Sequence, residues 1–289
     1  MSVWLPGAPC TPAGCATHQG PVARRITAVA RLTAGLLTAL AGILVGPLVA
    51  LLALVLGTRF RHLATRCWTR AVLRAFGVRL RIVGRPYAPR GSLVVANHIS
   101  WLDIPLIAAA LPGRMLAKTE VRHWPVLGPL AARGGTFFLE RDRLRTLPAT
   151  VAEMASALHG GARVIAFPEG STWCGREQGR FRHAVFQAAL DAGASVQPVR
   201  ITYLPTGAAA FVGEDSLPAS LWRVVAAGEL TAEIRLLPAI PAGSFPDRRS
   251  LARAAQRAVA RDSANLPSLS VHQFVNSIPA AASSVRTPS

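Results

Sequence analysis

A histidine and an aspartate lie five positions apart in the segment NHISWLD, which runs from Asn97 to Asp103. A neutral imidazole can accept a proton near pH 7, and a carboxylate that binds the imidazole fixes its tautomer. Positions five apart on one helix point about 140° away from each other, so the two side chains cannot share a helix face. They can meet if His98 lies in the turn after a strand and Asp103 in the first turn of a helix. The pair is therefore a candidate general base with its orienting acid.

The same segment also has a structural interpretation. Ser100 followed by Asp103 resembles a capping box, and an acid in the first turn of a helix is favourable in any case. The position of the pair favours chemistry, because the apolar run SLVVA (92–96) precedes it and predicts a buried strand. Ligands of open α/β sheets bind at the carboxyl ends of such strands.

Further polar segments follow apolar runs. Arg141 and Arg143 come after the run TFFLE and could bind a phosphate with their planar guanidinium groups, or form a surface loop of ion pairs. In FPEGSTW (167–173), Glu169 could accept hydrogen bonds from substrate hydroxyls, while a plain turn is the alternative. Pro198 in SVQPVRI predicts a strand that lies at a sheet edge or is irregular.

The elements that carry these residues alternate between strands and helices, which predicts an α/β fold with a mixed sheet covered by helices. The expected strands are 79–83, 92–96, 114–118, 135–140, 162–168, 195–204 and 231–237, and the expected helices are 143–161, 182–193 and 247–264. We expect the α/β domain to span 77–265, between a disordered leader (1–30) and a disordered tail (266–289).

The segment 31–76 predicts a membrane anchor. No charged residue occurs in the 27 positions from Leu32 to Thr58, more than the roughly 20 needed to cross a bilayer core. Arginines flank both ends, so a spanning helix and a hairpin dipping into one leaflet are both compatible, with Gly46 and Pro47 as a bend point. The next helix carries Arg66, Arg70 and Arg74 on one face and lies either on an anionic membrane surface or in solvent.

The charge of the chain indicates a polyanionic partner. The net charge is +18, from 32 Lys+Arg against 14 Asp+Glu, and the mean hydropathy is +0.34. A membrane partner is favoured over nucleic acid, because the sequence contains no nucleic-acid module and its aromatic residues are not interleaved with basic ones. The four cysteines show neither metal-ligand spacing nor a disulfide framework, so we expect no metal site.

Taken together, the motifs resemble those of the glycerolipid acyltransferases, and the 1-acylglycerol-3-phosphate acyltransferases in particular. The resemblance covers about residues 60 to 240. The matching segments are N-H-x-S-x-x-D at 97–103, K-x-E…P…G at 118–128, a strand ending in arginine at 137–141, F-P-E-G-S at 167–171 and apolar-x-Pro-apolar at 196–199. One residue departs from the family pattern, since Thr172 stands where the family carries an arginine near the acceptor's phosphate.

This departure keeps two acceptors open. Arg176, Arg180 or Arg182 could substitute for the missing arginine. A related branch that acylates lyso-ornithine lipid tends to carry E-G-T-T at this point, and its downstream segment is similar to 211–215 and 221–223 here.

The resemblance implies direct transfer of a fatty acyl group from acyl-CoA or acyl carrier protein to a lysolipid hydroxyl, with no other cofactor. His98 would be the base and Asp103 its orienting acid, while backbone N–H groups near the helix start or near Gly170 would stabilise the oxyanion. Substrate-binding roles are implied for Lys118, Arg141, Glu169, Gly170, Ser171 and Pro198. The enzyme would lie on the cell membrane with its catalytic domain on the cytoplasmic side. A basic membrane-binding protein without catalysis, and a hydrolase that uses the same base, are the competing classes.

Overall fold

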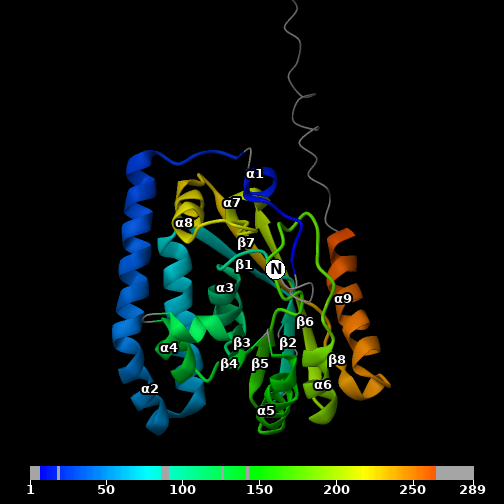
Figure 1. The fold of residues 1–289 in the computed structure, drawn as a ribbon. Coiled ribbons are helices and arrows are strands. Elements are labelled where there is room, and N and C mark those ends of the chain that lie inside the picture. Colours follow the sequence, from blue (N-terminus) through cyan, green and yellow to red (C-terminus); the bar gives the residue numbers. More distant parts are fainter. Residues whose placement is uncertain (1–6, 18–19, 86–90, 125–126, 141–142, 265–289) are drawn as a thin grey trace, which may run out of the picture.

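A mixed β-sheet forms the centre of the molecule (Figure 1). The structure is a computed structural model that describes residues 7–17, 20–85, 91–124, 127–140 and 143–264. The sheet has eight strands in the order β1-β7-β6-β2-β5-β3-β4, with β8 paired to β6. Their bounds are β1 Val78–Val83, β2 Ser92–Ala96, β3 Arg114–Lys118, β4 Phe137–Leu139, β5 Arg163–Ala166, β6 Ser195–Leu204, β7 Leu230–Leu236 and β8 Ile240–Pro241. The predicted mixed sheet is confirmed.

Five neighbouring strands run in one direction and so end at one edge of the sheet. β2 pairs in parallel with β5 and with β6, while β3 pairs in parallel with β5 and with β4. β7 is antiparallel to β6, and β1 is parallel to β7. The segments that follow β2, β5, β3 and β4 therefore gather at a common edge, where ligands of α/β sheets bind.

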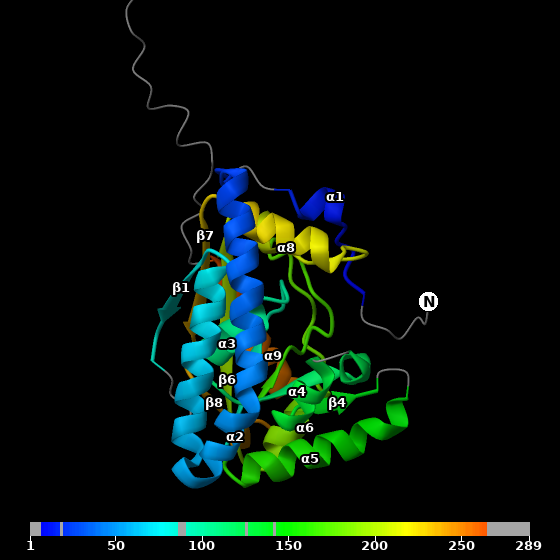
Figure 2. The same ribbon diagram turned by 90° about the vertical axis from the view of Figure 1, so that its left-hand side faces the viewer.

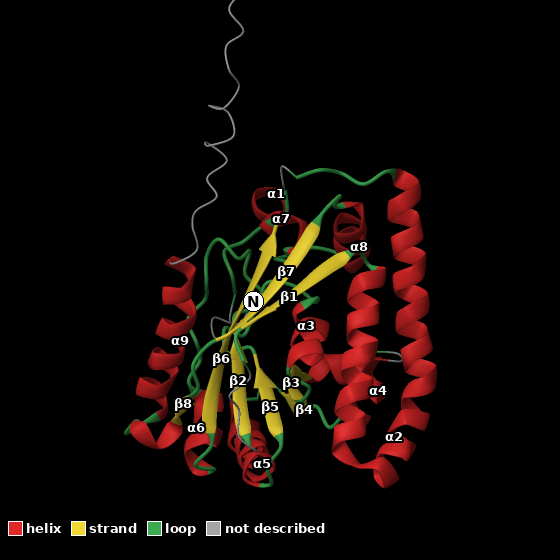
Figure 3. Ribbon diagram, turned by 180° about the vertical axis from the view of Figure 1, so that it is seen from behind, coloured by secondary structure: helices red, strands yellow, loops and turns green. Residues whose placement is uncertain are grey.

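Helices cover both faces of the sheet (Figure 3). On one side lie α2 Arg25–Ala75, α3 Asp103–Ala110 and α8 Leu217–Ala226, and on the other lie α5 Leu147–His159, α6 Ala184–Asp191 and α9 Arg248–Ala264. Strand β2 shows why the sheet needs two layers. Val94 and Ala96 belong to the core under the first group, while Leu93 and Val95 belong to the core under the second. Alternate side chains of a strand point to opposite faces, so a fully apolar strand must be buried on both.

The remaining helical segments are short and connect the main elements. They are α1 Pro12–Cys15, α4 Leu127–Arg133 and α7 Thr206–Ala209, with 3₁₀ turns at Thr119–His123, Leu144–Thr146 and Ala242–Ser244.

Helix α2 is a hairpin of two antiparallel limbs (Figure 2). The limbs, 25–56 and 58–75, meet at Gly57, whose φ of 81° and ψ of 178° interrupt the helix. The indole N–H of Trp68 in the second limb donates to the backbone oxygen of Thr38 in the first, at 3.0 Å. The expected bend at Gly46 and Pro47 is wrong, because the helix continues through both. A glycine with a positive φ can reverse the chain direction, whereas an isolated proline removes one hydrogen bond and the helix continues.

The two limbs differ in what their apolar residues contact. The core of the domain buries Val72 and Leu73 of the second limb, together with Phe76, which directly follows the limb. This part of the apolar face of the second limb is therefore not free to lie on a membrane. In the first limb the leucines and valines from Leu36 to Leu56 are largely exposed, and Leu54 and Val55 near the turn keep 81% and 86% of their surface. A large exposed apolar surface of this kind marks a binding or membrane surface. The first limb is thus a candidate membrane segment.

The leader differs from the expected disordered segment. Residues 7–17 are ordered, and α1 lies near α7 at one end of the sheet (Figure 1). Cys10 and Ala16 are buried against the domain. Thr11 caps α1 through its hydroxyl, which accepts from the N–H of Gly14. Burial of small apolar groups offsets the conformational entropy that the leader loses on ordering, whereas its composition alone predicted disorder. The expected disordered tail (266–289) lies outside the described residues.

Candidate active site

The loop that carries His98 is fixed to the neighbouring strand. Strand β2 ends at Ala96, and the side chain of Asn97 then continues the pairing with β6. Its amide nitrogen donates to the oxygen of Ile201 at 2.9 Å, and its oxygen accepts from the N–H of Ile201 at 2.8 Å. Asn97 is itself buried. One side chain therefore imitates a backbone ladder and sets where the loop leaves the sheet.

His98 and Asp103 are in direct contact. Nδ1 of His98 lies 2.7 Å from Oδ2 of Asp103, the first residue of α3. The same oxygen accepts the N–H groups of Ile99 at 2.6 Å and Ser100 at 2.9 Å. The carboxylate thus caps the loop before α3 and binds the imidazole, so the two interpretations of the motif hold together. As an acceptor it places the imidazole proton on Nδ1 and leaves Nε2 with a lone pair.

A tyrosine completes the environment of Asp103. The hydroxyl of Tyr203, on β6, donates to Oδ1 of Asp103 at 2.6 Å. Burial, together with the negative charge of Asp103, raises the pKa of Tyr203 well above its usual 10, so it remains a donor. Sequence reasoning missed this residue. Its only signal was a place on the same strand face as Val199 and Ile201, and no local motif connects it with a histidine 105 positions earlier.

The histidine is the member of this group that a substrate can reach. Its side chain keeps 20% of its surface exposed, whereas that of Asp103 keeps none. The imidazole stacks on the ring of Phe167, with centroids 4.2 Å apart and planes inclined by 19°. This packing and the bond to Asp103 leave the ring one orientation. Preorganisation of that kind is what a general base needs.

Glu169 holds the site together from the other side. Its side chain is buried, Oε2 accepts the N–H of His98 at 2.8 Å, and Oε1 accepts the N–H of Gly179 at 3.1 Å. Both oxygens are thus occupied by backbone donors, which differs from the expected contact with substrate hydroxyls. Glu169 instead ties the loop after β2 to the loop after β5. Burial raises the pKa of its carboxyl to about 8, although the two N–H donors act in the opposite direction.

The rest of the FPEGST segment forms a tight turn. Gly170 has a φ of 75°, in the left-handed region that favours glycine, and its N–H donates to the oxygen of Phe167 at 3.1 Å. Ser171 and Thr172 are half-buried beside it. Three N–H groups near the helix start and this turn, those of Ile99, Ser100 and Gly170, already donate to protein acceptors. The expected oxyanion donor therefore stays unassigned.

Two other loops donate hydrogen bonds to the backbone of the loop that carries His98. The N–H of Trp173 donates to the oxygen of His98 at 2.7 Å, and the N–H of Phe211 donates to the oxygen of Ile99 at 3.0 Å. Behind Phe211, Asp215 and Arg223 form an ion pair with little exposed surface. The segments compared above with the lyso-ornithine branch thus lie against the catalytic loop.

The other predicted site residues are distributed along the same edge or beyond the described chain. Lys118 ends β3 and is exposed, two strands away from β2 in the sheet order. Arg141 lies outside the described residues. Arg143 is exposed, and its Nε lies 3.8 Å from a carboxylate oxygen of Glu140.

Pro198 lies in a central strand, at an irregularity. Its neighbours Ser195 and Val196 pair with β8, while pairing with β7 begins at Val199. Proline has no N–H to donate, and Pro198 lies where the antiparallel partner of β6 changes from β8 to β7. The predicted irregularity is therefore confirmed, and an edge position is not. Pro198 therefore shapes β6, which carries Tyr203.

The raised pKa of Glu169 predicts how stability depends on pH. Between its usual 4.5 and about 8, the folded protein holds a proton that the unfolded chain has released. This carboxyl therefore stabilises the fold fully below pH 4.5, and its contribution is lost as the pH rises toward 8. The free energy of unfolding of the parent minus that of Glu169→Gln should fall by up to about 1.4 kcal/mol per pH unit over this interval. Urea unfolding in detergent at a series of pH values measures the difference.

Glu177→Gln, which removes an exposed carboxyl from the same loop, is the control measured over the same pH range. A difference for Glu169→Gln that is constant, or that increases with pH, would contradict the assignment.

Comparisons with known proteins show the family of the chain. A family model described as Acyltransferase matches residues 79–202. The lyso-ornithine lipid O-acyltransferase of Pseudomonas aeruginosa is 39% identical over 209 residues, which cover 70% of this chain and 79% of that protein. The 1-acyl-sn-glycerol-3-phosphate acyltransferase of Neisseria meningitidis is 37% identical over 206 residues, which cover 68% and 80%.

A solved structure shares the fold. The crystal structure of the 1-acyl-sn-glycerophosphate (LPA) acyltransferase PlsC from Thermotoga maritima aligns with a TM-score of 0.66 at 20% identity, over 84% of this chain and 98% of that one. The resemblance found in the motifs is thereby confirmed: this chain belongs to the acyltransferase family and is an acyltransferase enzyme.

Proposed function

We propose that the protein transfers a fatty acyl group from a thioester to the free hydroxyl of a lysophospholipid, converting 1-acylglycerol-3-phosphate to phosphatidic acid. The observation that carries the proposal is the contact between His98 and Asp103, completed by Tyr203, at the carboxyl edge of the sheet. The two relatives described above are named for acylation of lyso-ornithine lipid and of 1-acylglycerol-3-phosphate, both of which are lysolipids with a hydroxyl to esterify.

In the proposed reaction His98 acts as the base. Its Nε2 takes the proton of the lysolipid hydroxyl while the oxygen attacks the thioester carbonyl. Asp103 stabilises the imidazolium that forms, as it does not itself need to move a proton. Collapse of the tetrahedral intermediate forms the ester, breaks the C–S bond and returns the proton from Nε2 to the departing thiolate. Atoms and charge balance without an acyl-enzyme. The sequence also lacks a G-x-S-x-G nucleophile elbow.

Charge supports an anionic acceptor. Near the histidine, the carboxylate of Asp103 is buried and bound by four hydrogen-bond donors, and the raised pKa of Glu169 keeps that carboxyl largely protonated at pH 7. Lys118 at the same sheet edge is exposed, as are Arg176 and Arg180 after the turn at Gly170. A phosphate monoester carries more negative charge than the zwitterionic head of an ornithine lipid, so a cationic edge favours the phosphate.

Lyso-ornithine lipid is the second candidate acceptor, and a specific residue favours it. Thr172 replaces the arginine that the family motif places near the acceptor's phosphate. The 39% identical relative of Pseudomonas aeruginosa is named for this acceptor. Either acceptor would use the same base, because the hydroxyl and not the head group reacts.

The donor is proposed to be acyl-CoA or acyl carrier protein. Both present the acyl group as a thioester, and both are anionic, so exposed arginines of the domain suit either one. The donor is soluble in the cytosol, while the acceptor and product reside in the bilayer. We therefore place the catalytic domain on the cytoplasmic face of the cell membrane, with the α2 hairpin inserted.

An acceptor panel tests the main proposal. Protein purified in detergent is incubated with labelled oleoyl-CoA or oleoyl carrier protein and with lysophosphatidic acid, lyso-ornithine lipid or water alone. We expect label in phosphatidic acid, and a loss of at least about 1,000-fold in kcat for His98→Ala, as for removal of a catalytic base from a triad. His159→Ala, at the end of α5, is the matched control and should retain activity.

The outcomes separate the alternatives. Label in ornithine lipid alone would replace the phosphate acceptor with the second candidate, and Thr172→Arg should then lower kcat/KM for that lipid. Release of free fatty acid alone would make the protein a hydrolase. Equal activity of the parent and His98→Ala would remove His98 as the base.

Tyr203→Phe tests the support of Asp103. The ring keeps its packing, but Oδ1 of Asp103 loses its donor, a hydrogen bond to a charged group worth about 1.5–3 kcal/mol. We expect kcat to fall by about 10- to 100-fold with KM nearly unchanged, because the change affects the base and not lipid binding. Tyr87→Phe, which alters the other tyrosine of the chain, is the control. A kcat within twofold of the parent would show that Asp103 orients His98 without this donor.

Val55→Asp tests the membrane role of α2. Val55 is 86% exposed near the turn of the hairpin, so a charge there leaves the fold intact. An aspartate costs up to about 2.5–3.5 kcal/mol in a membrane helix, with the largest cost at the helix centre, so binding to phosphatidylglycerol vesicles should weaken by about tenfold in a sedimentation assay. Ala260→Asp, exposed on α9, should bind as the parent does. Equal binding of all three proteins would contradict insertion of the hairpin.

A further inference from the structure

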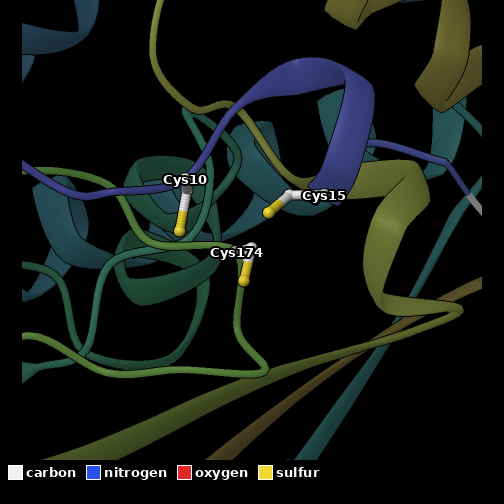
Figure 4. A group of neighbouring side chains, drawn as sticks. All are labelled: Cys10, Cys15 and Cys174. Carbon is white, nitrogen blue, oxygen red and sulfur yellow. The ribbon is translucent and has the colours of Figure 1, made fainter.

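Three of the four cysteines meet beside the active site, although one of them is far from the other two in the sequence (Figure 4). The sulfur atoms of Cys10, Cys15 and Cys174 all lie within 4.8 Å of one another. Cys10 and Cys15 come from the leader, and Cys174 comes from the loop after β5. Among the residues the structure describes, these three make the one group of metal-ligating side chains gathered this closely. Cys67, the fourth cysteine, is exposed on α2.

The packing around the cluster holds the leader in place. Cys10 and Cys174 are buried and form a small core with Val212, while Cys15 is half-buried. Two glycines let the leader approach. A Cβ at Gly207 would lie 3.2 Å from the oxygen of Cys15, and would also meet the leader at the oxygen of Thr17. The three sulfurs are thus brought together by a closely packed interface.

The second glycine approaches the other leader cysteine. A Cβ at Gly213 would lie 3.0 Å from the oxygen of Cys10, and the φ of 58° at this position also favours glycine. Loss of either glycine would push the leader away without altering a sulfur atom.

We propose that Cys10, Cys15 and Cys174 bind a zinc ion through three thiolates, with water as the fourth ligand. Zinc prefers sulfur ligands in tetrahedral geometry at about 2.3 Å, which places sulfurs about 3.8 Å apart. The observed group needs a contraction of about 1 Å or less to reach that spacing. Hard cations such as Mg²⁺ and Ca²⁺ require oxygen ligands and do not fit this all-sulfur group.

The surroundings of Cys174 suit a thiolate ligand, because the backbone N–H groups of Glu177 and Arg176 form hydrogen bonds with its sulfur. Zinc binds thiolates, so binding releases the thiol protons to solvent, and the positive charge of the metal takes their place.

The site would connect the leader to the catalytic loop. Cys174 follows Trp173, whose N–H donates to the backbone oxygen of His98. A metal bound by Cys174 and two leader residues would therefore restrain the loop that supports the base from behind. The exposed edge of His98 is not covered by this arrangement, so the proposed role is structural and independent of the identity of the acceptor.

Metal content of the full chain tests the proposal. The protein is purified in detergent under reducing, anaerobic conditions, and zinc is measured by mass spectrometry after gel filtration. Replacement by Co²⁺ gives a thiolate-to-cobalt charge-transfer band. We expect one zinc per chain in the parent and in Cys67→Ser. Affinity should fall at least about tenfold in Cys10→Ser, Cys15→Ser and Cys174→Ser, since even loss of an outer partner of a ligand has that effect.

Gly207→Ala controls for effects of removing a cysteine that do not involve the metal. It retains every sulfur but displaces the leader, so zinc affinity should also fall while thermal unfolding of the apo-protein shows that the domain is folded. Zinc should raise the Tm of the parent and of Cys67→Ser but not that of Cys174→Ser.

Several results would overturn the proposal. One is unchanged zinc content in the three serine variants. Another is a parent that binds no zinc at micromolar concentration and shows four reactive thiols. A third is a disulfide between Cys10 and Cys174 in the parent, detected by peptide mapping, with no metal bound. That last result would identify a redox cross-link in place of a metal site.

Discussion

The structure of the site depends on one buried carboxylate. The side chain of Asp103 has no exposed surface, and a buried charge without partners is strongly destabilising. Its two oxygens receive four donors: His98, Ile99 and Ser100 from the loop, and Tyr203 from β6. In the observed conformation the loop supplies three of the four. The hydrogen bonds that the buried carboxylate requires therefore also orient the base. The spacing of the N-H-x-S-x-x-D motif allows the loop to fold back onto the first turn of α3.

A second buried carboxyl has the opposite electrostatic character. Glu169 has two donors, both of them backbone N–H groups, whereas Asp103 has two backbone and two side-chain donors, and burial raises the pKa of Glu169 to about 8. Both groups fix the same loop, one through the side chain of His98 and one through its N–H. Because its raised pKa leaves Glu169 largely protonated at neutral pH, this carboxyl adds little negative charge beside the imidazole. The two acids therefore have separate roles: Asp103 orients the base, and Glu169 joins two loops.

Local sequence signals predicted most of the fold, and long-range contacts account for what they missed. Each predicted strand from 79–83 to 231–237 exists, because short runs rich in β-branched and apolar residues, bounded by turn residues, specify strands strongly. The contact of His98 with Asp103 was also predictable, since both lie in one segment. Tyr203 was not, because its partner is set by the register of β6 against β2. The ordered leader was missed for a similar reason: residues that contact Gly207 and Gly213 across the fold leave no periodic pattern.

The turn of α2 shows the same limit in another form. Proline in an apolar helix suggested a bend at Pro47, but a helix absorbs one lost hydrogen bond and the chain reverses at Gly57. Because the chain reverses at Gly57, the first limb begins and the second limb ends at the same end of the hairpin. Val72 and Leu73 anchor the second limb in the domain core.

The hairpin would then hold the active edge at the bilayer surface, where the lysolipid arrives from the membrane and the thioester from water. Two substrates that approach from different phases can meet at one base, and direct transfer between them requires no acyl-enzyme.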